Sequence, residues 1–85
     1  MRVTVLYFAR LREAMGRSRE VLEVPDAVAT LGQLRRWLAE RGDPWARAFA
    51  EVSPIRGALD QRVQPDDAQL HDGAEVAFFP PVTGG

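Results

Sequence analysis

The stretch TLGQLRRWLAER, residues 30–41, is the one long amphipathic helix that the sequence predicts. Thr30 followed three residues later by Gln33 is the pattern of a capping box, which marks a helix start. The next glycine in the chain, Gly42, is expected to end the helix. Leucines repeat at helical spacing on one face: Leu31, Leu34 and Leu38. We therefore expect this helix to pack across the hydrophobic core.

Two apolar stretches near the ends of the chain, residues 2–8 and 75–79, alternate in polarity and predict strands. In each strand the polar residues mark the wetter face, so Phe8 and Phe79, which share that parity, are expected to be exposed. The opposite faces supply the expected core partners of the helix: Val3, Val5, Val76 and Phe78.

Shorter elements complete the prediction. They are a helix over 9–15 ended by Gly16, a strand over 19–24, a short helix with Asp43 as its N-cap and Pro44 as its first residue, and a strand over 55–59 followed by a loop. This order describes a single α+β domain with one mixed sheet under one main helix. If the two apolar terminal strands lie side by side at the centre, residues 1–79 form a β-grasp (ubiquitin-like) fold.

The last six residues, Pro80, Pro81, Val82, Thr83, Gly84 and Gly85, are expected to form an extended tail over 80–85. Proline fixes φ, β-branched residues stay extended, and glycine carries no side chain. A terminal carboxylate is ionised at neutral pH, so its acyl group must be activated before transfer, for instance by attack on the α-phosphate of ATP. An enzyme that activates this end of the chain must admit it through a narrow channel. Gly-Gly fits such a channel best because neither residue has a side chain.

Composition excludes several classes of function. The chain has 85 residues, a net charge of −1 and no cysteine, and its 11 basic residues are all arginine. We expect no affinity for nucleic acid or membranes, no disulfide and no thiolate metal site, and a cytoplasmic location. No phosphate-binding loop or nucleophile–base spacing is present, so the chain is expected to have no catalytic apparatus and to bind no cofactor.

Two further groups of polar residues are candidates for sites. The single histidine, His71, lacks visible partners for a metal and is interpreted as a solvated loop residue. Acidic residues near the end of the chain are interpreted as a solvated cluster near the base of the tail: Asp66, Asp67, Asp72 and Glu75.

The sequence EVAFFPPVTGG, residues 75–85, resembles the C-terminal signature of the molybdopterin synthase small subunit, a ubiquitin-like sulfur carrier. FARLRE, residues 8–13, is similar to the Phe-Ala-x-x-Arg-Glu segment of that family, and Asp72-Gly73 before the last strand also fits. Asp60-Gln61 stands where the family has Asn-Gln, a departure that bears on one local hydrogen bond.

The resemblance implies that a ubiquitin-activating-type enzyme uses ATP to adenylate Gly85, and that a sulfur donor protein converts the adenylate to a thiocarboxylate. The carrier would then dock on the large synthase subunit in a 2:2 complex and insert its tail. There the sulfur would pass to a cyclic pyranopterin monophosphate in molybdenum cofactor biosynthesis, with the active site on the partner. The uncovered sheet face is expected to be the docking surface, centred on Phe8 and Phe79 with Arg12 at its margin.

Other functions remain open at this point. Sulfur carriers for thiamine synthesis or tRNA thiolation also end in Gly-Gly, but the sequence FFPPVT before it favours the carrier of molybdenum cofactor biosynthesis. A ubiquitin-like modifier attached to lysines of other proteins is a third possibility; the absence of lysine excludes only lysine-linked chains of this protein. A binding module with an inert tail is the fourth, and the stiff tail argues against it.

Overall fold

The computed structural model describes residues 1–52 and 54–81, which fold into five strands and three helices in the order strand, helix, strand, two helices and three strands. The strands are β1 (Arg2–Tyr7), β2 (Arg19–Glu23), β3 (Arg56–Leu59), β4 (Arg62–Gln64) and β5 (Ala74–Phe79). The helices are α1 (Ala9–Met15), α2 (Leu31–Ala39) and α3 (Trp45–Glu51).

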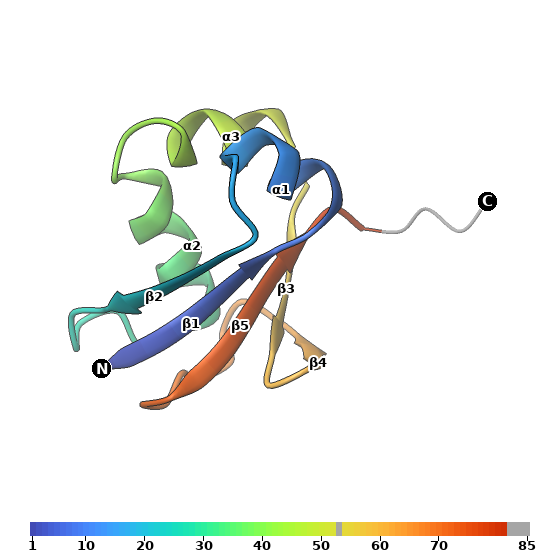
Figure 1. Cartoon of the computed structure of the whole chain (residues 1–85). Coiled ribbons are helices and arrows are strands. Elements are labelled where there is room, and N and C mark those ends of the chain that lie inside the picture. The colour runs from blue at the N-terminus through green and yellow to red at the C-terminus, as the bar shows by residue number, and fades with distance from the viewer. Residues whose placement is uncertain (53, 82–85) are drawn as a thin grey trace.

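The five strands form one mixed sheet in the order β2-β1-β5-β3-β4, with the helices on one side of it (Figure 1). β1 and β5 pair in parallel at the centre, and the other neighbours are antiparallel. The two terminal strands therefore lie side by side, which confirms the predicted β-grasp architecture.

The core lies between α2 and the covered face of the sheet. Thr30 Oγ1 accepts a hydrogen bond from the Gln33 backbone at 3.2 Å, and Gln33 Oε1 accepts one from the Thr30 backbone at 3.1 Å, so the predicted capping box is present. All the residues predicted for the core are at most 1% exposed: Val3, Val5, Leu31, Leu34, Leu38, Val76 and Phe78. Alternation along the strands and helical spacing thus located the core correctly.

Replacing Leu34 by alanine is expected to lower the free energy of unfolding by about 2–5 kcal/mol, because the side chain is fully buried and leaves a cavity. The control is Arg36→Ala on the exposed side of the same helix, which should change stability by about 0.5 kcal/mol or less. Urea denaturation measures both. Equal stability of the two variants would contradict the assigned packing.

Two local predictions were wrong. α3 begins at Trp45 with Pro44 as its N-cap and no side-chain cap, because the turn before it already satisfies the first donors. Ala46 N–H donates to Gly42 O at 2.9 Å and Ala48 N–H to Pro44 O at 2.8 Å, so Asp43 is not needed as a cap.

The other error is β4, which had been expected to be a loop. Asp60 and Gln61 form a tight hairpin turn in which both have positive φ, 49° and 71°. Such a turn usually contains glycine or asparagine, so Asp-Gln gave little signal for a hairpin. Asp60 nevertheless makes a local hydrogen bond, since its Oδ1 accepts from the Glu75 backbone N–H at 3.0 Å.

Candidate functional site

The base of the tail lies where the two central strands end together. Because β1 and β5 are parallel, their carboxyl ends share one edge of the sheet, and Phe8 N–H donates to Phe78 O at 3.2 Å. β5 therefore ends beside the start of α1 (Figure 1). Of the predicted tail, Pro80 and Pro81 are half-buried, whereas Val82, Thr83, Gly84 and Gly85 lie outside the described residues.

The predicted docking residues come together at this edge. Phe8 is 46% exposed, as predicted, and follows directly on β1. Arg12 is exposed one helical turn later on α1, where its backbone N–H donates to Phe8 O at 3.3 Å. Phe79 lies opposite Arg56 of β3, and both residues are on the uncovered face of the sheet.

The exposure of Phe79 differs from the prediction, because this side chain is half-buried. β5 is the central strand, so neighbours on β3 and at the end of β1 cover Phe79 from both sides. Parity placed it on the correct face, but parity alone does not say whether a strand is central or at an edge. Phe8 is therefore the more accessible aromatic of the pair.

Strand register also places an apolar row across the uncovered face. Leu6 of β1 lies opposite Ala77 of β5, Ala77 opposite Ala58 of β3, and Ala58 opposite Val63 of β4. Val63 is 56% exposed because it stands on an edge strand. The row continues the surface that begins at Phe8 and Phe79, which gives the face an apolar centre.

Sequence reasoning missed two exposed valines on this face. Val21, on the edge strand β2, is 54% exposed and lies opposite Thr4. Val21 alternates with the charged residues Arg19 and Glu23 along the strand, which indicates that it lies on the same uncovered face as they do. For Val63 no such signal existed, because the hairpin that creates β4 was not recognised.

A buried carboxylate on β2 fixes the end of β1. Glu20 accepts hydrogen bonds from the Tyr7 hydroxyl at 2.6 Å and from Trp45 Nε1 at 2.9 Å. Arg17 and Arg41 lie 3.0 and 3.6 Å from its other oxygen. Because Tyr7 immediately precedes Phe8, this network positions the aromatic residue at the base of the tail.

The charges of this network perturb both acidic groups. Burial raises the pKa of Glu20, but the hydrogen bonds from Tyr7 and Trp45 and the charges of Arg41 and Arg17 outweigh it, so the net pKa is lowered. Burial, together with the neighbouring Glu20 carboxylate, raises the pKa of Tyr7. Glu20 is thus held ionised and Tyr7 protonated.

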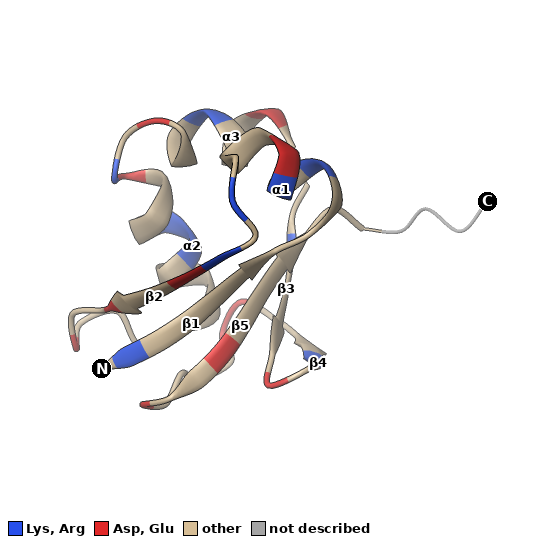
Figure 2. Ribbon diagram, viewed as in Figure 1, with Lys and Arg blue, Asp and Glu red and all other residues tan. Residues whose placement is uncertain are grey.

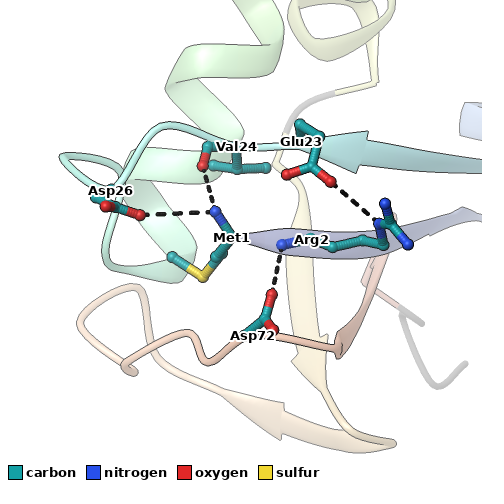
Figure 3. A network of polar contacts seen from close by, with 6 residues as sticks. All are labelled: Met1, Arg2, Glu23, Val24, Asp26 and Asp72. Atoms are coloured by element: carbon teal, nitrogen blue, oxygen red, sulfur yellow. Dashed lines mark hydrogen bonds and ion pairs between the residues drawn. The ribbon is translucent and has the colours of Figure 1, made fainter.

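The expected acidic cluster at the base of the tail is not formed, and that interpretation was wrong. Asp72 lies before β5, at the opposite end from the tail, where it accepts a hydrogen bond from the Arg2 backbone at 2.7 Å (Figure 3). Asp66 forms an ion pair with Arg35 of α2 instead. The acids are separated because β5 runs the length of the sheet between the Asp72 turn and the tail.

His71 is exposed, as predicted, but it has a partner. Its Nε2 lies 2.5 Å from Asp60 Oδ2, and this hydrogen bond raises the pKa of His71. The pKa of Asp60 is lowered, mainly by the hydrogen bond from the Glu75 backbone N–H and to a smaller extent by the one with His71. Within residues 1–52 and 54–81, no three His, Asp or Glu side chains gather as a metal site would require. Nor does any helix there have the length and apolar character needed to span a membrane.

The chain is similar to known proteins over its whole length. The model of the ThiS family matches residues 5–85. Molybdopterin synthase sulfur carrier subunits from Haemophilus influenzae and Escherichia coli are 40% and 42% identical over 83 residues, covering 98% of this chain and 99% of each relative.

Solved structures resemble the fold. SAMP1 from Haloferax volcanii superposes with a TM-score of 0.77 at 24% identity, covering 100% of both chains. A chain from the protein–protein complex of subunits 1 and 2 of molybdopterin-converting factor from Helicobacter pylori has a TM-score of 0.65 at 23% identity, also over 100% of both chains. At these identities the likeness supports the fold alone.

Proposed function

The chain belongs to the ThiS family, and from this membership we propose that it is the sulfur carrier subunit of a molybdopterin synthase. The observation that carries the proposal is the junction of tail and docking face. The tail begins at Pro80, directly beside Phe8 and Phe79 on an uncovered, largely apolar sheet face. A partner that binds to that face would be positioned to accept the tail into its active site.

The chemistry proposed for Gly85 proceeds in balanced steps. Its carboxylate attacks the α-phosphate of ATP, a P–O bond forms, and pyrophosphate leaves. The terminal sulfur of a cysteine persulfide on a sulfur donor protein then displaces AMP from the acyl-adenylate and forms an acyl disulfide. A second thiol attacks the donor's cysteine sulfur, so a disulfide forms on the donor side and the thiocarboxylate is released on Gly85. The large subunit transfers that sulfur to a cyclic pyranopterin monophosphate, and water restores the carboxylate.

The residues of this chain have separate parts in that sequence. Gly84 and Gly85 supply a thread without side chains, and Pro80 and Pro81 limit the conformations of the tail before binding. Phe8 and Phe79, with Arg12 at the margin, form the proposed docking surface. Because the sequence contains no cysteine, this chain has no thiol, and the sulfur must come from another protein.

Intact mass spectrometry tests the proposal. The protein is co-expressed with its adenylating enzyme and a sulfur donor, and a thiocarboxylate adds about 16 Da because sulfur replaces one oxygen. Incubation with the large subunit and cyclic pyranopterin monophosphate should return the mass to its starting value. A charged carrier that never loses sulfur to this substrate would instead favour thiamine synthesis or tRNA thiolation.

A ubiquitin-like modifier is the alternative from a different class, and SAMP1-like folds are compatible with it. It predicts isopeptide adducts on lysines of other proteins in place of the thiocarboxylate mass. The relatives at 40% and 42% identity are both named as sulfur carriers, which is why the carrier is preferred.

Replacing Phe8 by alanine is expected to weaken binding to the large subunit by more than about 1 kcal/mol, because an exposed aromatic beside the tail is a typical interface anchor. Stability should change little, since the side chain is 46% exposed. Isothermal titration calorimetry and thermal melting separate the two effects.

Val21→Ala provides the comparison, because Val21 is equally exposed on the same face but far from the tail, and its loss should matter less. Phe79→Ala should reduce both binding and stability because Phe79 is half-buried. Unchanged binding by the Phe8 variant would remove Phe8 from the docking surface.

A further inference from the structure

The uncovered sheet face changes charge along its strands. At the tail end, Arg19 of β2 lies opposite Leu6, and Arg56 of β3 lies opposite Phe79. Arg10 and Arg12 follow Phe8 on α1. These four residues, Arg10, Arg12, Arg19 and Arg56, are called the arginine collar below.

The collar is exposed and its charges are not neutralised internally. Within residues 1–52 and 54–81 none of the four arginines forms an ion pair, whereas Arg2, Arg17, Arg35 and Arg41 each do. Two acidic residues are next to the collar in sequence, Glu13 on α1 and Glu20 on β2. Glu20, however, lies on the covered side of the sheet and is paired with Arg17 and Arg41. With Glu20 already paired, four unpaired cations beside Glu13 leave this end of the face positive.

The other end of the same face carries acidic residues, two of which, Glu23 and Asp60, are paired with basic side chains. Glu75 of β5 lies opposite Thr4, and Glu23 of β2 is paired with Arg2 at 3.1 Å. Asp60 holds the backbone of Glu75 from the β3–β4 turn. Figure 2 shows acidic positions on β2, on β5 and at the turn between β3 and β4.

An apolar centre with a charged margin is the usual construction of a specific interface, and its partner carries charges of the opposite sign at the matching positions. Because the collar lies at the tail end of the strands, the charge distribution also selects one of the two ways in which a partner could lie along the strands.

We propose that the large synthase subunit carries acidic side chains around the mouth of the channel that receives the tail, and that these face the arginine collar. This inference rests on the proposed function. The paired charges orient the carrier during encounter so that its tail points into the channel.

The anionic pterin substrate is a less suitable partner for the collar. If fully extended, the six residues that follow Phe79 would place the reacting end of the tail about 20 Å from it. The Debye length at physiological ionic strength is about 8 Å, so charges at the collar are largely screened from a substrate at the tip. The surface that meets the collar is therefore the rim of the channel.

The test compares two double variants of equal net charge. Arg19→Ser/Arg56→Ser removes half of the collar, and Arg36→Ser/Arg47→Ser removes two exposed, unpaired arginines from α2 and α3 on the helical side of the described chain. Stopped-flow measurements give the association rate constant with the purified large subunit in dilute buffer and in about 1 M salt, where the Debye length is about 3 Å.

In dilute buffer the collar variant should associate about tenfold more slowly than the wild type, and this difference should largely vanish in high salt. The control variant should stay within about twofold of the wild type. Thermal melting of both variants checks that the fold is intact.

Equal rates for the two double variants would overturn the inference, because net charge rather than the collar would then govern association. A tenfold loss that persists in high salt would also overturn it, since the arginines would act through contact and not through their field. In either case normal thiocarboxylate formation and sulfur transfer by the wild type would leave the proposed function standing. If the wild type failed in those two reactions, both the proposed function and the inference about the collar would be refuted.

Discussion

Deletion of Gly85 is expected to reduce activation of the tail by orders of magnitude while leaving the fold unchanged. The shortened chain still ends in a carboxylate, but this group falls about 3.5 Å short of the reacting phosphate. Catalysis by positioning depends on reacting groups held within a fraction of that distance, so most of the benefit of orientation is lost. ATP–pyrophosphate exchange with the adenylating enzyme measures the effect.

Gly84→Val is the companion variant, and it should fail for another reason. The carboxylate remains at its full reach, but a β-branched side chain enters a channel shaped for bare backbone. Neither change touches the buried residues, so thermal melting should match the wild type in both. Wild-type exchange by the Gly85 deletion would refute the carrier mechanism, because the terminal residue would then not be the reacting group.

The fold was largely predictable because its main elements follow from strong local patterns. Helical spacing of Leu31, Leu34 and Leu38 and alternation in β1 and β5 identified the core, which is fully buried as predicted. These patterns are reliable because each places apolar groups on one side of a regular element. The central pairing of β1 with β5 followed from the apolar character of both strands.

What escaped prediction depends on contacts between distant segments. The half-buried state of Phe79 comes from the central position of β5, and the exposure of Val63 comes from an edge strand. Strand order decides both, and local alternation does not encode strand order. The Asp60–Gln61 hairpin was missed because both residues adopt positive φ without the glycine that normally signals it.

The candidate site was predictable in part. Parity correctly placed Phe8 and Phe79 on the uncovered face, and the parallel pairing of β1 and β5 brings Arg12 close to them. Glu20 was missed, although its parity with Leu22 placed it on the covered face, because a carboxylate in a strand ordinarily faces water. Its partners Tyr7 and Trp45 stand 13 and 25 residues away in sequence, so only the fold brings them together.

Replacement of Glu20 by alanine is expected to cost about 3–5 kcal/mol of unfolding free energy at neutral pH, the loss typical of removing one partner from a buried charged network. The Tyr7 hydroxyl is fully buried and would lose its acceptor, as would Trp45 Nε1. Arg17 and Arg41 are partly exposed and can be rehydrated, so they contribute less to the loss. Urea denaturation at pH 7 measures the difference.

The same carboxylate makes the stability depend on pH in a defined direction. The pKa of Glu20 is lowered in the folded state, so its contribution is complete above the ordinary value of 4.5 and is lost as the pH falls through the folded pKa. Glu20→Gln removes this titration and keeps the side-chain shape. The stability difference between wild type and this variant should therefore be largest near pH 7 and should shrink in acid.

Glu13→Gln on the exposed surface of α1 is the matched control, and it should leave the acid limb of the stability curve unchanged. A difference between wild type and Glu20→Gln that stays constant from pH 7 into acid would show that the charge of Glu20 does not stabilise the fold. Because Glu20 holds Tyr7 and Tyr7 precedes Phe8, loss of this charge should also weaken docking of the large subunit. The Glu20→Gln variant should thus bind more weakly than wild type at pH 7, although Glu20 itself does not lie on the docking face.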